Sequence, residues 1–451
     1  MSEFIIFAKF KFMKHIILLL ISSLILNGSR DAFGQKKLND YFDHLFQQQK
    51  FMGSVAIMHN DSLLYSKAVG YSDFGKKKVN HTYTRFRIGS LTKTFSAALV
   101  LKAVEEQKLH LNDVLKKYYP ELKNADKITI QQLLQHRSGI FNFTEKDDAR
   151  AWEQRDHSEK EFIQYIATEK SNFEPGTAYE YSNTNYALLG FILQKIYHKP
   201  FAKILEEKIC KPLHLQNTYY SFETDPGNDE ALSYNIQNTY LGNAKVNFSN
   251  HPASGGIVST PADVNKFLFA LFNGKLIQPK TLKTMLPVEK GAYGMGIQKL
   301  TFDQPSGYEH GGRVENYFSD YWYFPKENLG IVILSNAINI NMDAINLVLL
   351  KYAYGGMPEL PNFNQIKDLS EVEFTKIKGT YMDQDNKESV TISSDGHALV
   401  FQSSVTGQDY VSFTSKGNGR FEYADIELQF LPHQNEVLLK QGATETIYRK
   451  K

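Results

Sequence analysis

The chain has 451 residues, of which 42% are hydrophobic and 22% charged, and its 51 lysines and arginines nearly balance its 49 aspartates and glutamates. This composition is typical of a globular protein with one large and one smaller domain, and it excludes the strongly basic surface that nucleic-acid binding requires. Cys210 is the only cysteine and the 13 histidines show no metal-binding spacing. An intrachain disulfide is therefore excluded, and we expect neither a metal nor a cofactor.

The first 34 residues are expected to form a secretory signal peptide. Lys14 precedes an apolar run, Ile16 to Leu26, that is shorter than the roughly 20 residues of a membrane-spanning helix. Small residues follow, and we place the cleavage site after Gly34. The protein is therefore predicted to be exported, to the periplasm or the medium, with no stable membrane span after cleavage. A permanent N-terminal anchor is the alternative.

The next predicted elements are a polar helix over 38–49 and two strands, 53–60 and 62–72. Asn60-Asp61 separates the strands, and both residues tolerate the backbone conformations of a tight hairpin turn. After Ser90, apolar residues recur at helical spacing, which predicts a helix with one strongly buried face.

A mostly helical block is predicted from about residue 128 to 286, with one helix starting at Ser259-Thr260-Pro261. Strands return at 316–325 and 330–336, and a helix over 344–354 closes the region. Strands, then helices, then strands of the same sheet predict the α+β fold class: an antiparallel sheet flanked by helices, with an all-helical subdomain.

The PELP sequence at 358–361 marks a change in the pattern of the sequence. Short alternating runs follow it, with a hairpin signal at Asp395-Gly396, and they predict a small antiparallel β domain over 366–451. The predicted organisation is thus a signal peptide (1–34), a main domain (35–357) and this C-terminal β domain.

Ser90 and Lys93 form the only S-x-x-K sequence in the chain, at the head of a predicted helix. Residues three apart share a helix face, so the two side chains are expected to meet. The positive end of the helix dipole disfavours a proton on Lys93. A neutral amine could accept the proton of Ser90 and make it a nucleophile. The alternative is a helix cap followed by an exposed lysine.

Tyr181 and Asn183 form the only Y-x-N sequence. A tyrosine near a lysine ammonium ionises more easily and can carry a proton to a leaving group. The amide of Asn183 can bind a substrate carbonyl or hold Lys93. The alternative is an aromatic core residue followed by a helix N-cap.

His310, Gly311 and Gly312 form the only H-x-G sequence. Two glycines on a strand edge leave room for another backbone to approach closely, and here that backbone would be the substrate's. The alternative is a hairpin bend with a surface histidine.

Together these sequences resemble the three motifs of the serine penicillin-recognising enzymes, in the same order. The chain is most similar to the branch that holds class C β-lactamases and D-alanyl-D-alanine carboxypeptidases, over about residues 38–355. The supporting stretches are FRIGSLTKTF, ITIQQLLQHRSGI, FEPGTAYEYSNTNYALLG, SGGIVSTPADV and YGMGI. The C-terminal region resembles the lipocalin-like β domain that is often attached to such proteins.

The resemblance implies a β-lactamase/transpeptidase-like fold and an acyl-enzyme on Ser90, with Lys93 and Tyr181 managing its proton. The backbone N–H groups of Ser90 and Arg313 would form the oxyanion hole. Asn183 would hold the substrate's amide.

In the same comparison His310, with Gly311 and Gly312, would line the opposite strand and help bind the substrate's terminal carboxylate or assist proton transfer. Class C β-lactamases usually have K-T-G at these positions, and loss of the permanent charge should weaken attraction for a β-lactam carboxylate. The family's usual Gly-Phe is replaced by Asn316-Tyr317, where the asparagine can adopt a positive φ.

We therefore predict an exported serine hydrolase that acts on a D-Ala-D-Ala-type peptide, such as a cell-wall peptide, or on another small amide or ester. One alternative is a β-lactamase that hydrolyses β-lactam antibiotics. The other is a penicillin-binding or sensor module that does not turn over.

Overall fold

The structure, a computed structural model, describes residues 33–236, 239–242, 247–250, 252–289, 292–300, 305–361, 363, 371–384, 389–394, 399–403, 411–417, 419–423, 426–431, 435–441 and 444–451. The predicted signal peptide lies almost wholly outside these residues, so its cleavage stays a prediction. Within the described part of the chain, no helix is both long and apolar enough to cross a membrane.

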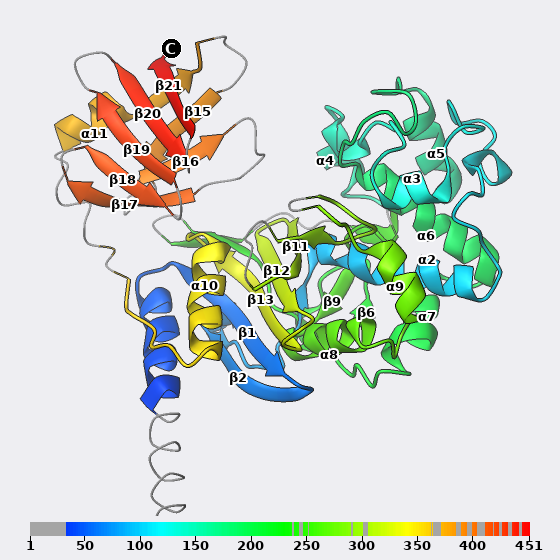
Figure 1. Ribbon diagram of the computed structural model, residues 1–451, viewed down its shortest axis with the longest axis horizontal. Helices are drawn as coiled ribbons and strands as arrows, with labels where there is room; N and C mark the ends of the chain where they lie inside the picture. The colour runs from blue at the N-terminus through cyan, green and yellow to red at the C-terminus, as the bar shows by residue number, and fades with distance from the viewer. Residues whose placement is uncertain are drawn as a thin grey trace, which may run out of the picture.

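A six-stranded antiparallel sheet forms the centre of the main domain, in the order β10-β11-β12-β13-β1-β2 (Figure 1). Strand β1 pairs with β13 along its whole length, so the two ends of the domain's sequence share one sheet, as predicted. The predicted hairpin is also confirmed, because Asn60 and Asp61 both have positive φ, 50° and 64°. The strands are β1 Phe51–His59, β2 Ser62–Val69, β10 Gln298–Lys299, β11 Tyr308–Val314, β12 Tyr317–Phe324 and β13 Leu329–Ile338.

Two helices cover one face of this sheet: the first, over residues 33–47, and α10 (Met342–Ala353) (Figure 1). Phe42 of the first helix and Leu349 of α10 belong to one buried cluster with Ile333 of β13. The burial of this apolar layer fixes the N-terminal helix on the sheet.

The helical region covers the other face. Its helices are α2 Thr92–Glu105, α3 Ile130–Leu134, α4 Ala149–Trp152, α5 Glu159–Ala167, α6 Asn183–Tyr197, α7 Phe201–Leu205, α8 Pro261–Phe272 and α9 Pro279–Met285. The predicted start of α8 is confirmed, because the Thr260 hydroxyl accepts the N–H of Asp263 and Pro261 takes the first position. Short strands also occur here, among them β5 Phe86–Arg87, β6 Tyr219–Tyr220 and β9 Ile257–Ser259.

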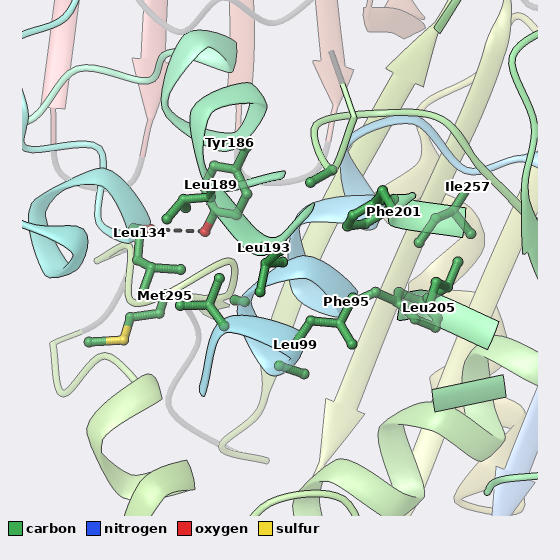
Figure 2. Close-up of a cluster of buried hydrophobic side chains, with 14 of the residues drawn as sticks. Phe95, Leu99, Leu134, Tyr186, Leu189, Leu193, Phe201, Leu205, Ile257 and Met295 are labelled. Atoms are coloured by element: carbon green, nitrogen blue, oxygen red, sulfur yellow. Dashed lines mark hydrogen bonds between the residues drawn. The ribbon is translucent and has the colours of Figure 1, made fainter. Parts of the chain in front are cut away.

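Helix α2 runs through the middle of the largest buried cluster (Figure 2). Lys102, Val104 and Glu105 are its residues that are not fully buried. The predicted single buried face was therefore wrong, because α6 and α9 pack on the sides that a surface helix would expose to water. Alanine, serine and threonine on these sides allow such close packing.

Eight strands form a closed antiparallel barrel at the C-terminal end, which confirms the predicted β domain. Strand β14 (Gly379–Met382) closes the barrel by pairing with both β15 (Ser389–Ser394) and β21 (Thr444–Lys450). The barrel has its own core, which includes Tyr381 and Leu428. The predicted turn at 395–396 lies outside the described residues, although the strands that flank it pair as a hairpin would. The other elements are α11 Glu371–Ile377, β16 Leu399–Ser403, β17 Val411–Gly417, β18 Arg420–Tyr423, β19 Ile426–Leu431 and β20 Glu436–Gln441.

Candidate active site

Ser90 lies in a single 3₁₀ turn, Gly89–Leu91, immediately before α2. The Ser319 hydroxyl of β12 donates to the Ile88 carbonyl at 2.7 Å and so ties this turn to the central sheet. Ser90 is half-buried, whereas its neighbours Gly89 and Leu91 are buried. The turn thus presents one reactive side chain at the boundary between sheet and helical region.

Lys93 is fully buried and contacts three oxygens. Its Nζ lies 2.9 Å from Ser90 Oγ, 2.8 Å from Asn183 Oδ1 and 2.8 Å from the Ser254 carbonyl. Burial lowers the pKa of Lys93 well below its ordinary value, because no water solvates the ammonium form. The alternative of an exposed lysine is therefore excluded.

These contacts determine where a neutral Lys93 places its lone pair. The Asn183 Oδ1 and Ser254 carbonyl oxygens are acceptors only, so each takes one N–H of a neutral amine. A neutral amine has two N–H groups, and its lone pair then faces Ser90 Oγ. The arrangement orients the hydroxyl proton of Ser90 toward Lys93, as general-base activation requires.

A strained turn presents the Ser254 carbonyl to Lys93. The preceding residue, Ala253, is buried and has a φ of 72°, a left-handed conformation that costs a non-glycine residue about 1–2 kcal/mol. The Ser96 hydroxyl of α2 donates to the Ala253 carbonyl at 2.8 Å and holds the turn in place. Strain of this kind is often found at functional sites.

Tyr181 lies on the other side of Ser90 and its hydroxyl donates to Ser90 Oγ at 2.7 Å. Burial raises the pKa of Tyr181 well above 10, so the predicted easier ionisation was wrong for this state of the site. The reason is that Tyr181 is itself buried, although Lys93 Nζ lies 4.9 Å from the centre of its ring. Tyr181 is therefore a proton donor in the resting site.

Asn183 is the first residue of α6, and its side chain does not cap the helix. Its Oδ1 accepts from Lys93, and its Nδ2 donates to Thr144 Oγ1 at 3.2 Å. The predicted role of holding Lys93 is confirmed as a contact, and the N-cap alternative is wrong.

Strand β11 passes close to the Ser90 turn, with a glycine on each side of the contact. A Cβ on Gly312 would lie 2.3 Å from the Ile88 carbonyl oxygen, and one on Gly89, whose φ is 48°, would lie 2.8 Å from Arg313 N. Only glycine fits such an approach. The backbone that requires Gly312 is thus the chain's own, whereas a Cβ on Gly311 would meet nothing within 4 Å.

His310 is 3% exposed, which excludes the surface-histidine alternative. Its Nδ1 lies 2.6 Å from the Gly311 carbonyl oxygen, so Nδ1 carries the proton, and its Nε2 accepts from the Tyr293 hydroxyl at 3.0 Å. Burial, followed by the nearby Lys93, lowers the pKa of His310 to about 3. The imidazole is therefore neutral.

His136 is a site residue that the sequence did not reveal. It is fully buried, its Nδ1 accepts the Ser182 N–H at 3.1 Å, and its ring lies 4.4 Å from that of Tyr181. Burial lowers the pKa of His136 far below its ordinary value. The Nε2 of His136 has no hydrogen-bond partner among the described residues.

Tyr293 is the second residue missed, and its ring lies 4.7 Å from His136 and 5.6 Å from His310. Both residues occur in stretches typical of the family, but neither shows a chemical spacing of its own. One turn expectation was also wrong: between β11 and β12 the positive φ falls on Glu315, at 50°, and not on Asn316.

The structure thus brings all of the predicted site residues together around Ser90. Among the described residues, no group of three or more His, Cys, Asp or Glu side chains could hold a metal ion. The arrangement brings a serine hydroxyl, a buried lysine amine of lowered pKa and a tyrosine hydroxyl to one oxygen, which are the groups that acyl transfer would need.

Comparison with known proteins gives a consistent result. The family model described as Beta-lactamase matches residues 38–347. Protein flp of Staphylococcus aureus (strain N315) is 28% identical over 67% of this chain, and the match spans 63% of the length of that protein. The teichoic acid D-alanine hydrolase of Staphylococcus aureus (strain MRSA252) is 28% identical over 69% of this chain and 76% of its own.

A solved D-stereospecific amidohydrolase from Streptomyces sp. superposes with a TM-score of 0.57 and 25% identity. The similarity covers 68% of this chain and 94% of the amidohydrolase.

Proposed function

Since the chain belongs to the β-lactamase family and is a serine hydrolase, we propose that it is an exported enzyme that cleaves small D-amino-acid amides or esters through an acyl-enzyme on Ser90. The observation that carries this proposal is the pair of contacts on Ser90 Oγ, from Lys93 at 2.9 Å and Tyr181 at 2.7 Å. A structural serine would not need as its partner a buried lysine whose pKa is lowered.

In the acylation step, Lys93 accepts the Ser90 proton while Oγ attacks the substrate carbonyl. Tyr181 gives its hydroxyl proton to the leaving nitrogen or oxygen as the carbon–heteroatom bond breaks, and it recovers a proton from Lys93. The product amine or alcohol then leaves, and Ser90 holds the acyl group. Each proton that is taken is returned, so the two residues act as one relay.

The backbone N–H groups of Ser90 and Arg313 are the proposed oxyanion hole, on either side of the close approach of β11 to the Ser90 turn. One such donor lowers the barrier by about 3 kcal/mol. Asn183, whose side chain is fixed by Lys93 and Thr144, would contact the substrate's amide. Deacylation by water repeats the relay in reverse.

The substrate class is inferred from the relatives, whose names include a teichoic acid D-alanine hydrolase and a D-stereospecific amidohydrolase. The first name describes hydrolysis of a D-alanine derivative, and the second describes D-stereospecific hydrolysis of an amide. A D-alanyl peptide, ester or amide of the cell envelope fits this class, and the predicted signal peptide would bring the enzyme to it.

The test is intact-protein mass spectrometry with D- and L-alanine aryl esters and with benzylpenicillin, followed over time beside Ser90→Ala. We expect a D-alanyl adduct on the wild type that the variant lacks, with D preferred over L. Absence of any Ser90 adduct would contradict the proposal. A penicillin adduct lost within seconds would instead favour a β-lactamase, and D-alanyl and penicillin adducts that both persist would favour a sensor module.

A further inference from the structure

His310 lies on β11, two residues before the glycine that packs against the Ser90 turn. Side chains alternate along a strand, so His310 and Gly312 face the helical region together. Gly312 lies against the Ser90 turn, since a Cβ there would be 3.0 Å from Ser90 N. A substrate whose carbonyl lies at Ser90 and which extends along β11 therefore passes His310.

Both nitrogens of His310 are already bonded within the protein. Nδ1 donates to the Gly311 carbonyl at 2.6 Å, and Nε2 accepts from Tyr293 at 3.0 Å. The tautomer is fixed, so neither nitrogen offers a proton to a substrate carboxylate. Burial of the ring also opposes a second proton on it.

The rest of the motif does not replace the missing charge. Arg313 lies on the opposite face of β11 from His310, and its guanidinium carbon is 5.0 Å from the centre of the Phe318 ring. Gly311 has no side chain. A carboxylate beside His310 would therefore lose its water without gaining a charged partner, which is strongly unfavourable.

We propose that the substrate group lying along β11 beside His310 is uncharged, so that the enzyme prefers esters and amides whose leaving group carries no carboxylate. Tyr293 and His310 are then specificity-determining residues. This inference rests on the function proposed above and narrows its substrate class. It reverses the sequence-based expectation that His310 helps to bind a terminal carboxylate.

The test uses two pairs of substrates that differ in one charge. The amide pair is N-acetyl-D-Ala-D-Ala and its C-terminal carboxamide, and the ester pair is N-acetyl-D-Ala-D-lactate and its methyl ester. Within each pair the scissile bond is the same. We expect kcat/KM to be at least about tenfold higher for the uncharged member with the wild-type protein. A smaller preference, or one for the acid, would overturn the inference.

Mass spectrometry separates this result from failure of the proposed function. A Ser90 adduct that forms with a preference for the acids overturns only the specificity inference. Failure of all four compounds to acylate Ser90 overturns the proposed function and this inference with it.

Two variants test the role of the charge itself. His310→Lys places a cation at the same position, and we expect the kcat/KM ratio to move toward the acids by about tenfold or more. His310→Gln is the matched control, polar but uncharged, and its ratio should stay as in the wild type whatever its rate. An equal shift in both variants would contradict the inference. If His310→Lys does not fold, the comparison on the wild-type protein still decides.

Discussion

At the scale of single residues, the burial that suits Lys93 to act as a base also lowers the stability of the fold at neutral pH. Its folded-state pKa is depressed, whereas the unfolded chain binds the proton up to about pH 10.4. Below that pH the unfolded state holds more protons than the folded state, so stability rises with pH until the unfolded lysine also titrates. The buried amine thus makes the fold less stable at neutral pH than at pH 10.

We expect Lys93→Met to remove this pH dependence as well as the activity. The stability of the wild type relative to Lys93→Met should increase between pH 7 and pH 10 by up to about 1.4 kcal/mol per pH unit. Urea unfolding at four pH values measures this difference in stability. Lys102→Met, a change on the same helix, is the control. A difference in unfolding free energy between the wild type and Lys93→Met that stays constant with pH would show that Lys93 is charged in the folded state.

His136 is expected to position Tyr181 without contacting the substrate. Its ring packs on the Tyr181 ring, and its Nδ1 accepts the N–H of the buried Ser182. His136→Phe keeps a ring but leaves that N–H unpaired, which should shift the Tyr181 hydroxyl relative to Ser90. We expect kcat to fall about 10- to 100-fold with little change in KM.

His136→Asn is the matched variant, because a shorter side chain can still accept a hydrogen bond from Ser182. It should retain more of the wild-type kcat than His136→Phe. Equal kcat values for His136→Phe and the wild type would mean that His136 only fills space. A rise in KM with kcat unchanged would mean that His136 acts in substrate binding.

The sequence predicted those site residues that show a local chemical spacing. Ser90 and Lys93 are one helical turn apart, and their meeting follows from helix geometry. His136 and Tyr293 could not be predicted in the same way, because each reaches the site from a separate loop and acts through packing. The sequence predicted a lowered proton affinity of Lys93 from the helix dipole, but the burial that lowers its pKa could not be predicted, since it depends on contacts with α6 and the 253–254 turn.

At the scale of elements, a partly buried acidic cluster, Glu309, Asp320 and Asp343, lies between β11, β12 and α10. Burial, followed by the charge of Asp343 on α10, raises the pKa of Glu309 on β11 to about 7. Burial, followed by the charge of Glu309, raises that of Asp320 on β12, whose carboxylate accepts from Asn346 Nδ2 at 2.5 Å. Burial therefore opposes ionisation of each of these carboxyl groups, and the charge of one opposes ionisation of its neighbours.

The contribution of Glu309 to stability changes with pH in the opposite direction to that of Lys93. A raised folded-state pKa stabilises the fold below the unfolded value, about 4.3 for a glutamate, and this contribution is lost as the pH rises through about 7. We expect Glu309→Gln to be about as stable as the wild type at pH 5 but more stable at pH 8, by about 1–3 kcal/mol.

Thermal unfolding at pH 5 and pH 8 measures this difference. Glu359→Gln is the control, because Glu359 is an exposed acid whose carboxylate pairs with Lys351 of α10. A Glu309→Gln variant that is less stable than the wild type at pH 8 would show that the carboxylate is held ionised by a favourable contact.

Turns and buried helices show which parts of the fold could be predicted from the sequence. The hairpin at Asn60-Asp61 was predicted because both residues tolerate positive φ. The position of the positive φ in the β11–β12 turn was not predicted, because Glu315 adopts it only under the constraint of the paired strands that flank it. The burial of α2 on nearly all sides depends on long-range packing and leaves no local periodicity.

At the scale of the whole molecule, the described residues divide their apolar core between the main domain and the barrel. The barrel's buried cluster shares no residue with the clusters around the central sheet. Closure of the barrel through β14 and β21 satisfies the edges of its sheet internally. Beside the domain boundary, His44 Nε2 lies 3.0 Å from the Pro361 carbonyl oxygen and the His44 ring stacks on Phe363, and neither Pro361 nor Phe363 belongs to the barrel's buried cluster.

We therefore expect two unfolding transitions in scanning calorimetry, with enthalpies near 60 kcal/mol for the barrel and about 220 kcal/mol for the main domain. Val437→Ala removes buried apolar volume from the barrel, and should lower the smaller transition by about 5–15 °C while leaving the larger unchanged. Leu99→Ala in α2 is the matched change, and should lower only the larger transition. If both variants shift both transitions together, or if one transition carries the whole enthalpy, the barrel and the hydrolase domain unfold as one cooperative unit, and the barrel contributes directly to the stability of the site.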